Sequence, residues 1–165
     1  MDQDAPNVGP LIPEAELPDE PLFQGEYVHA LDSKGRLTIP ACLRPPLLPG
    51  MQIVRGQEQC LVIYTLSAWT QMWQEAARLP TVYGEIRQNN RRVFGAARAT
   101  LDQMGRILIP EHLRAFAQIQ DQAVIVGVNE MLEIWSPILW QANVEETRAN
   151  QQAIDKLKAN LGMRR

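Results

Sequence analysis

The chain has little cysteine and no long hydrophobic run. Its 165 residues contain two cysteines, Cys42 and Cys60, whereas a small secreted scaffold held by disulfides would contain many more. No apolar run approaches the length of a membrane span. The N-terminus also lacks the basic and then apolar segments of a secretory signal. These absences favour a cytoplasmic protein with no membrane partner.

The sequence also lacks motifs typical of catalysis or cofactor binding. We find no nucleophile elbow, no phosphate-binding loop and no paired acid and base. The two cysteines and the two histidines, His29 and His112, do not have the spacing of zinc ligands. We therefore expect a protein that is not an enzyme, with no catalytic residues, metal, cofactor or small-molecule substrate.

Basic residues are absent from the N-terminal segment, so the chain consists of an acidic segment followed by a mildly basic body. Residues 1–21 contain six Asp and Glu, five Pro and no Lys or Arg. Because proline blocks helices and there is little apolar surface to bury, we expect a disordered extension. The net charge is −3, yet residues 22–165 hold thirteen acidic and sixteen basic side chains. We interpret the extension as a solvating tail; the alternative is an acidic strip that competes with nucleic acid for the basic body.

The most informative feature present is an internal repeat. Residues 31–40 (LDSKGRLTIP) match residues 101–110 (LDQMGRILIP), and a Leu-Arg pair follows each copy. The similarity continues from residues 53–56 (IVRG) to 124–127 (VIVG), and from 61–64 (LVIY) to 132–135 (LEIW). A duplicated unit of about 45 residues is marginal alone, so we expect two units that share one core, with the pseudo-symmetry of a fused homodimer.

Local patterns predict the same elements in both repeats. Residues 27–31 are predicted to form a strand, with the side chains of 27, 29 and 31 on one face and those of 28 and 30 on the other, and Asp32 and Gly35 are typical of a tight turn. Residues 36–39 should return as the second strand of a hairpin, and Pro40 ends strand pairing before a short helix over 41–44. The second copy predicts a turn over Asp102–Gly105, a strand over 106–109 and a helix from 111 to about 118.

Helices are predicted outside the repeated segments. Residues 67–78 have helical apolar spacing, and a last helix should run from Trp140 to about residue 161. Several arginines lie in residues 78–98; they fit a solvated face, with backbone contact to DNA as the alternative. The predicted division is an extension (1–21), a first unit (22–68), a helical and basic connector (69–94), a second unit (95–140) and a C-terminal helix and tail (141–165).

The repeats resemble a known family. Residues 23–41 follow the pattern F-x-G-E-Y-x-H-x-L-D-x-K-G-R-L-x-I-P-A, which resembles the opening of the MraZ family of SpoVT/AbrB-type DNA-binding proteins. The second copy is similar through residues 101–110 and 126–136, so the resemblance covers about residues 23–140. It implies an α+β, mainly β fold, in which tandem SpoVT/AbrB-like repeats form a pseudo-symmetric, β-barrel-like body with peripheral helices.

The resemblance also implies a function. A member of this family would be a nucleoid-associated, bacterial transcription regulator of the division and cell-wall gene cluster. It would form an oligomeric ring with copies of itself and bind repeated boxes in promoter DNA. The alternative is a structural or protein-interaction module for assembly, without specific DNA binding. The sequence pI of about 5.4 favours that alternative.

The candidate site is the turn of each repeat. The family's Asp-x-x-x-Arg motif falls on Asp32/Arg36 and Asp102/Arg106, and the resemblance implies that the arginines contact DNA. A two-stranded ribbon fits the major groove, so the first turn can project Lys34 and Arg36, while Gly35 lets its backbone approach phosphate. The alternative is a structural pair, in which each aspartate accepts turn N–H groups and binds its arginine.

The second turn departs from the first. Gln103 and Met104 stand where the first turn has Ser33 and Lys34, and Gly105 is shared. The second turn therefore offers only Arg106 as a DNA contact, and we expect the first repeat to dominate DNA binding.

Overall fold

The computed structural model describes residues 20–162. The predicted disorder of the N-terminal extension falls mainly on residues 1–19, and the last three residues of the predicted tail are 163–165; both lie outside the described residues. The described residues form eight strands and five α-helices, so the fold is α+β and the strands are its most numerous elements. Within residues 20–162, no helix is long and apolar enough to cross a membrane.

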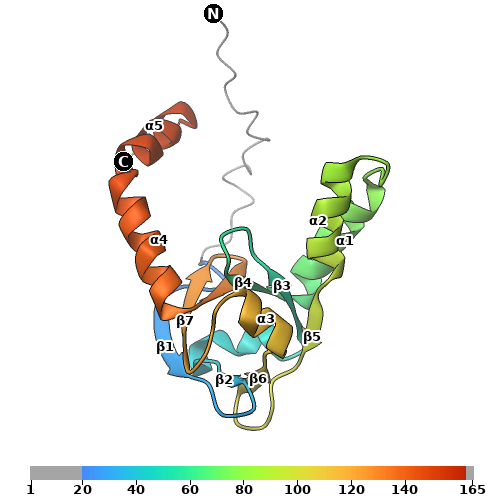
Figure 1. The fold of residues 1–165 in the computed structure, drawn as a ribbon, viewed down its shortest axis with the longest axis vertical. Helices are drawn as coiled ribbons and strands as arrows, with labels where there is room; N and C mark the ends of the chain where they lie inside the picture. Colours follow the sequence, from blue (N-terminus) through green and yellow to red (C-terminus); the bar gives the residue numbers. More distant parts are fainter. Residues whose placement is uncertain (1–19, 163–165) are drawn as a thin grey trace, which may run out of the picture.

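Six strands form one antiparallel sheet in the order β1-β7-β8-β4-β3-β5 (Figure 1). By the repeat, β1 corresponds to β5, β3 to β7 and β4 to β8. Exchanging the members of each pair gives the same order read from the other end of the sheet. The strands themselves thus confirm the tandem repeat. Their bounds are β1 Glu26–Ala30, β3 Met51–Arg55, β4 Leu61–Thr65, β5 Ala97–Ala99, β7 Gln122–Val128 and β8 Met131–Trp135.

The first strand of each repeat pairs with the third strand of the other. Tyr27 of β1 is opposite Ile125 of β7, and Ala97 of β5 is opposite Ile53 of β3. The two remaining strands, β2 (Arg36–Thr38) and β6 (Arg106–Leu108), also pair with each other across the repeats. Of the predicted hairpin between the first two strands, the described residues show the turn and a single antiparallel bridge between Leu31 and Leu37. The expected ladder between these strands is absent from them, because β2 forms its ladder with the equivalent strand of the other repeat.

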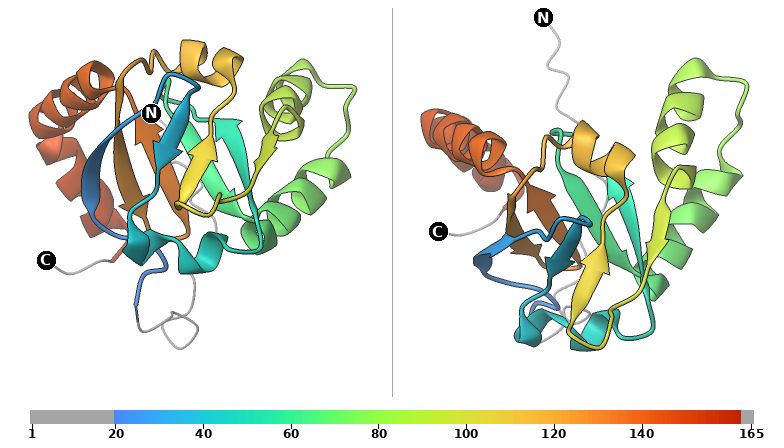
Figure 2. Two further views of the ribbon diagram at one scale, coloured as in Figure 1. Left: turned by 90° about the horizontal axis from the view of Figure 1, so that it is seen from below. Right: turned by 60° about the horizontal axis from the view of Figure 1, so that its bottom comes forward.

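The ladders of the described residues form two sheets and do not close into a barrel. The six-stranded sheet ends at β1 and β5, and the β2–β6 pair lies in front of it when the molecule is seen from below (Figure 2). Pro40 and Pro110 follow these two short strands closely, and proline has no N–H with which to extend a ladder. The crossing pair covers one side of the sheet as a separate layer.

A single hydrophobic core lies between this pair and the sheet. Leu37 and Ile107 point inward from β2 and β6 and are fully buried, together with Ile53 and Ile125 from the sheet. Both repeats contribute to this cluster, as expected for units too small to be stable alone. A smaller cluster on the other face of the sheet contains Val54, Val62, Val124 and Trp135.

Short helical segments follow the crossing strands. A 3-10 turn over Ala41–Leu43 and another over Pro45–Leu47 occupy the first repeat, and α3 (Glu111–Phe116) occupies the second. The segment of the first repeat does not become an α-helix, because Pro45 and Pro46 lack the N–H groups that an α-helical turn needs.

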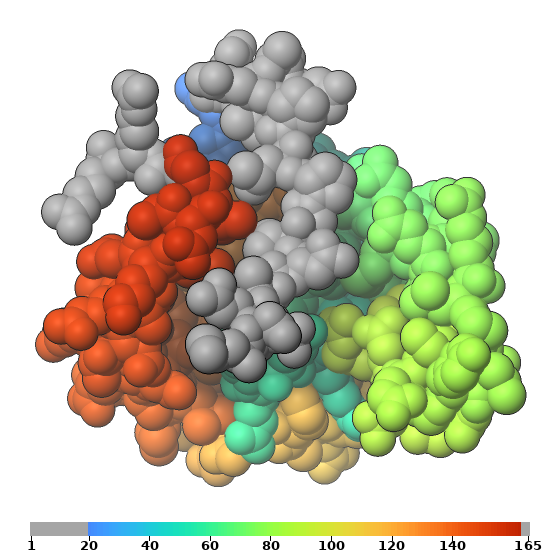
Figure 3. All heavy atoms as spheres, turned by 90° about the horizontal axis from the view of Figure 1, so that it is seen from above, coloured from blue at the N-terminus to red at the C-terminus, as the bar shows by residue number. Residues whose placement is uncertain are grey.

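Two helical pairs flank the outer face of the sheet. α1 (Leu66–Arg78) and α2 (Gly84–Phe94) form one arm, and α4 (Pro137–Ala149) and α5 (Gln151–Asn160) form the other, on the opposite flank (Figure 3). Thr65 and Ser136, at equivalent positions of the repeats, cap α1 and α4 by accepting the N–H of Ala68 and Leu139. The predicted single C-terminal helix is instead two helices. They meet at Asn150, a residue type that favours helix ends.

Candidate nucleic-acid interface

Both turns have the same backbone. The N–H of Gly35 donates to the carbonyl of Asp32 over 3.0 Å, and the N–H of Gly105 donates to the carbonyl of Asp102 over 3.0 Å. The two glycines have φ values of +80° and +74°, in the left-handed region where other residues are strained. The tight turns expected from the repeat are thus present, and glycine is required at their fourth position.

Each aspartate side chain holds its turn together. Oδ1 of Asp32 accepts the backbone N–H groups of Lys34 and Arg36, at 3.0 and 2.9 Å. Oδ1 of Asp102 accepts those of Met104 and Arg106, both at 2.9 Å. The backbone N–H of Arg36, helped by its guanidinium, lowers the pKa of Asp32 from 3.8 to about 2. The N–H of Arg106 likewise lowers the pKa of Asp102.

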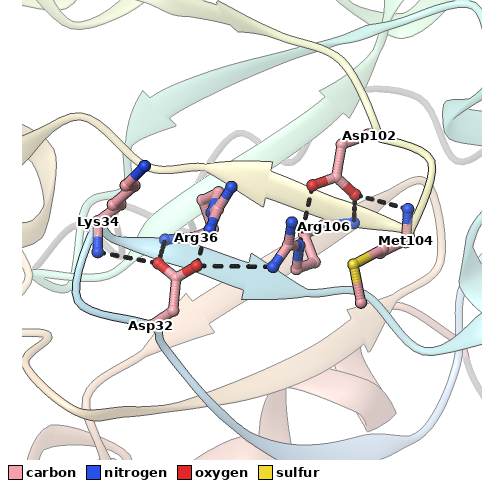
Figure 4. Close-up of polar contacts among 6 residues, drawn as sticks. All are labelled: Asp32, Lys34, Arg36, Asp102, Met104 and Arg106. Atoms are coloured by element: carbon pink, nitrogen blue, oxygen red, sulfur yellow. Dashed lines mark hydrogen bonds and ion pairs between the residues drawn. The ribbon is translucent and has the colours of Figure 1, made fainter.

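The same aspartates orient the two motif arginines (Figure 4). Oδ2 of Asp32 accepts from Nε of Arg36 at 2.5 Å, and Oδ2 of Asp102 accepts from Nε of Arg106 at 2.9 Å. A third ion pair joins the repeats, because Nη1 of Arg106 lies 3.7 Å from Oδ2 of Asp32. The structure thus contains the ion pairs of the structural interpretation. Among the described residues, no hydrogen bond engages the Nη groups of Arg36.

The β2–β6 pair presents these arginines on its solvent side. Arg36 is opposite Leu108, and Thr38 is opposite Arg106; all four side chains lie outward, because Leu37 and Ile107 between them point into the core. Lys34 and Met104 are exposed in the turns at opposite ends of the pair (Figure 4). This end of the molecule is opposite the helical arms (Figure 1).

Each turn is also braced by the other repeat. Ile39 donates its N–H to the carbonyl of Gly105 at 2.9 Å, and Ile109 donates to that of Gly35 at 3.0 Å. These two bonds lie beyond the two ends of the β2–β6 ladder. Each turn is therefore hydrogen-bonded to the chain of the other repeat just beyond its short strand.

Two further arginines lie beside the turns. Nε of Arg44 donates to the carbonyl of Ile39 at 2.7 Å, and Nε of Arg114 donates to that of Ile109 at 3.0 Å. A Cβ built on Gly105 would meet the guanidinium of Arg44, and one built on Gly35 would meet that of Arg114. Each arginine thus lies against the turn of the opposite repeat.

Sequence reasoning did not identify Arg44 and Arg114 as site residues. They form the Leu-Arg pairs that served only as markers of the repeat. Their equal spacing after the two turns was the available signal, but their approach to the opposite turn depends on strand exchange. We call the set of cations on and beside β2 and β6 the basic ribbon: Lys34, Arg36, Arg44, Arg106 and Arg114. The carboxylates of Asp32 and Asp102 lie among these cations and pair with two of them.

The arginines of the first helical arm do not join the basic ribbon. Arg87 donates through Nη1 to the carbonyls of Thr81 and Val82, both at 2.8 Å, and Arg92 donates to Asn89 at 3.1 Å. These bonds hold the loop between α1 and α2 and the surface of α2. Their arm lies away from the two turns (Figure 1).

Comparison with known proteins places both repeats in one family. The model of the family described as "MraZ protein, putative antitoxin-like" matches residues 22–91 and 93–160. The Transcriptional regulator MraZ of Roseiflexus sp. (strain RS-1) is 44% identical over 141 residues, which cover 85% of this chain and 99% of that protein. The proteins of the same name from Moorella thermoacetica and Pediococcus pentosaceus are 39% and 38% identical, over 81% and 85% of this chain and 94% and 96% of their own lengths.

Proposed function

The chain belongs to the MraZ family, and we propose that it is a sequence-specific, DNA-binding transcriptional regulator rather than an enzyme. The observation that carries this proposal is the basic ribbon. A two-stranded antiparallel ribbon fits the major groove of DNA, and here its solvent side displays Arg36 and Arg106. The names of the relatives, which are transcriptional regulators, support the same role.

In this proposal, the aspartates prepare the arginines for base contact. Each carboxylate accepts from Nε, which leaves both terminal nitrogens of Arg36 without a partner among the described residues, whereas Nη1 of Arg106 also faces Asp32. A guanidinium held this way loses less conformational freedom when it binds. Two parallel donors match the acceptors of guanine in the major groove, and such a bidentate contact discriminates by about 1–3 kcal/mol.

The two turns contribute unequally. Lys34 is an exposed ammonium at the tip of the first turn, suited to neutralising a phosphate. Met104 at the equivalent tip is 66% exposed and uncharged. Moreover, Arg106 is shared between two aspartates, whereas Arg36 pairs with one. The first repeat therefore supplies the stronger contact.

We further propose that the regulator acts as a ring on repeated promoter boxes of the division and cell-wall gene cluster. Apolar side chains are exposed on both helical arms, among them Val82 (75%) on the first arm and Ile138 (80%) on the second. Because the arms lie on opposite flanks (Figure 3), contact between unlike arms would be head-to-tail, and such interfaces generate rings when the rotation closes. A ring repeats the basic ribbon, so weak contacts to spaced boxes add by avidity.

The test is DNA binding by Arg36→Ala, measured by fluorescence anisotropy on DNA from upstream of the protein's own gene. Loss of one bidentate contact should weaken binding by about five- to 150-fold. The decrease in affinity should be larger in a ring, where every subunit loses the same contact. Arg148→Ala removes an exposed arginine of α4 and serves as the matched control, with affinity unchanged. Light scattering should show the same particle size for all proteins.

Full affinity of Arg36→Ala would reject the basic ribbon as the DNA site. Absence of DNA binding by the unsubstituted protein at low salt, with assembly intact, would favour the assembly module instead. The exposed apolar side chains of the arms are the observation that favours this second candidate.

A further inference from the structure

The N-terminal extension leaves the body at a fixed point. Phe23 is 1% exposed and pairs with Asn129: its N–H donates to the carbonyl of Asn129 at 2.8 Å, and the N–H of Asn129 donates back at 3.1 Å. Glu20 and Pro21, which precede it, are exposed. Whatever residues 1–20 contact, they are tethered beside the turn between β7 and β8.

The extension lies outside the body that this chain shares with its relatives. The family match begins at residue 22. The Roseiflexus protein is matched over 99% of its length, although the match covers only 85% of this chain. The shared fold and its DNA-binding surface therefore do not need the extension.

The charge of the extension is opposite to that of the basic ribbon. Residues 1–20 contain six Asp and Glu and no Lys or Arg. The basic ribbon gathers five cations on one end of the molecule, against the two carboxylates of Asp32 and Asp102. Attraction between segments of opposite charge requires no folded structure in either partner.

We propose that residues 1–20 occupy the basic ribbon when DNA is absent and compete with DNA for it. This inference rests on the proposed DNA-binding role of the ribbon. The extension is then an intramolecular regulator of affinity, specific to a chain with this composition. It makes the protein bind DNA more weakly and release it more readily than the body alone.

The tether is long enough for this contact. The anchor is Phe23, beside Asn129, and the first turn begins nine residues later at Asp32. An extended chain of that length spans at most about 30 Å. Nineteen residues can span at most about 60 Å. A segment tethered this closely has an effective concentration in the millimolar range, so even a weak contact would raise the apparent Kd for DNA by about two- to tenfold.

The arginines of the first helical arm are a poorer target for the extension. Arg87 and Arg92 already donate to Thr81, Val82 and Asn89. Arg78 and Arg91 share the two helices with the acidic residues Glu75 and Glu85. In the basic ribbon, Lys34 is exposed, and no hydrogen bond among the described residues engages its ammonium group. We therefore place the acidic residues at the ribbon.

The first experiment compares three proteins on the same upstream DNA: the full chain, residues 21–165, and a full chain with all six acids of residues 1–20 replaced by Asn or Gln. At about 50 mM salt, both altered proteins should bind two- to tenfold more tightly than the full chain. At about 500 mM the difference should vanish, because exposed charges are then screened. Equal affinity of all three at low salt would overturn the competition. Absence of binding by all three would instead count against the proposed function.

The second experiment locates the contact. The chain has three lysines: Lys34 in the first turn, and Lys156 and Lys158 on α5. A carbodiimide joins a carboxylate directly to a lysine in contact with it, so DNA-free protein should give crosslinks from residues 1–20 to Lys34. Added DNA and the substitution Lys34→Arg should each abolish them. Crosslinks only to Lys156 and Lys158, or none at all, would overturn the proposal.

Discussion

The first and second turns share a backbone and differ in their chemistry. In both, the aspartate accepts two turn N–H groups and orients an arginine, and glycine closes the turn with a positive φ. Yet the first turn carries Lys34 and the second Met104, and only Arg106 reaches the aspartate of the other repeat. The comparison separates the residues that build the turn from those free to contact a partner.

The shared part of the two turns is structural. In both copies the aspartate accepts the turn N–H groups, the glycine adopts a positive φ and the arginine donates Nε to the aspartate. The side chains at the tip make no such contribution, since Lys34 and Met104 participate only through their backbone N–H groups. A duplicated unit can thus change its tip without changing its fold.

The largest effect that tests this equivalence is expected at the turn glycines. In Gly35→Ala and Gly105→Ala, the methyl group requires a strained left-handed residue and displaces Arg114 or Arg44 from its place beside the turn. Each should lower the free energy of unfolding by about 1–2 kcal/mol, measured by urea denaturation at one protein concentration. Gly162→Ala is the control for backbone strain alone. Its φ is +70°, as in the turns, but a Cβ there meets nothing within 4 Å and displaces no arginine. Markedly unequal decreases in the free energy of unfolding for the two variants would contradict the structural equivalence of the turns.

The sequence predicted the turns and the duplication, but not the partners of the strands. Asp and Gly at fixed positions, followed by alternating apolar residues, identify a turn and a strand by local chemistry alone. The partner of β2 does not follow from local chemistry, because β2 forms one bridge at the end of β1 of its own repeat and a full ladder with β6 of the other repeat. The choice depends on packing of both repeats around one core, and no local pattern encodes it.

The same limit explains which site residues were missed. Asp32, Arg36, Asp102 and Arg106 lie within their own turns, so a local motif could identify them. Arg44 and Arg114 contact the turn of the opposite repeat, and that contact exists only once β2 pairs with β6. An arginine that recurs in both repeats without a local role therefore indicates a contact with the other repeat.

A smaller effect should follow from exchanging the tips of the turns. Lys34→Met should weaken DNA binding several-fold and reduce the salt dependence of binding by about one ion per lost phosphate contact. Met104→Lys should strengthen binding and increase that dependence by a similar amount. Anisotropy titrations over a range of salt concentrations measure both, and the double exchange should restore the original slope. No change with Met104→Lys would show that the second turn does not approach the DNA backbone.

The smallest effect concerns the two aspartates, whose surroundings differ by one ion pair. Because the pKa of Asp32 is lowered to about 2, its carboxylate stabilises the folded turn above about pH 4, and this contribution is lost as the pH falls toward 2. Carboxyl carbon shifts should therefore give a lower titration midpoint for Asp32 than for Asp102, since two guanidinium groups approach Asp32 and one approaches Asp102. Arg36→Ala should raise the midpoint of Asp32 alone. Arg106→Ala should raise both midpoints, and a rise confined to Asp102 would contradict the ion pair between the repeats.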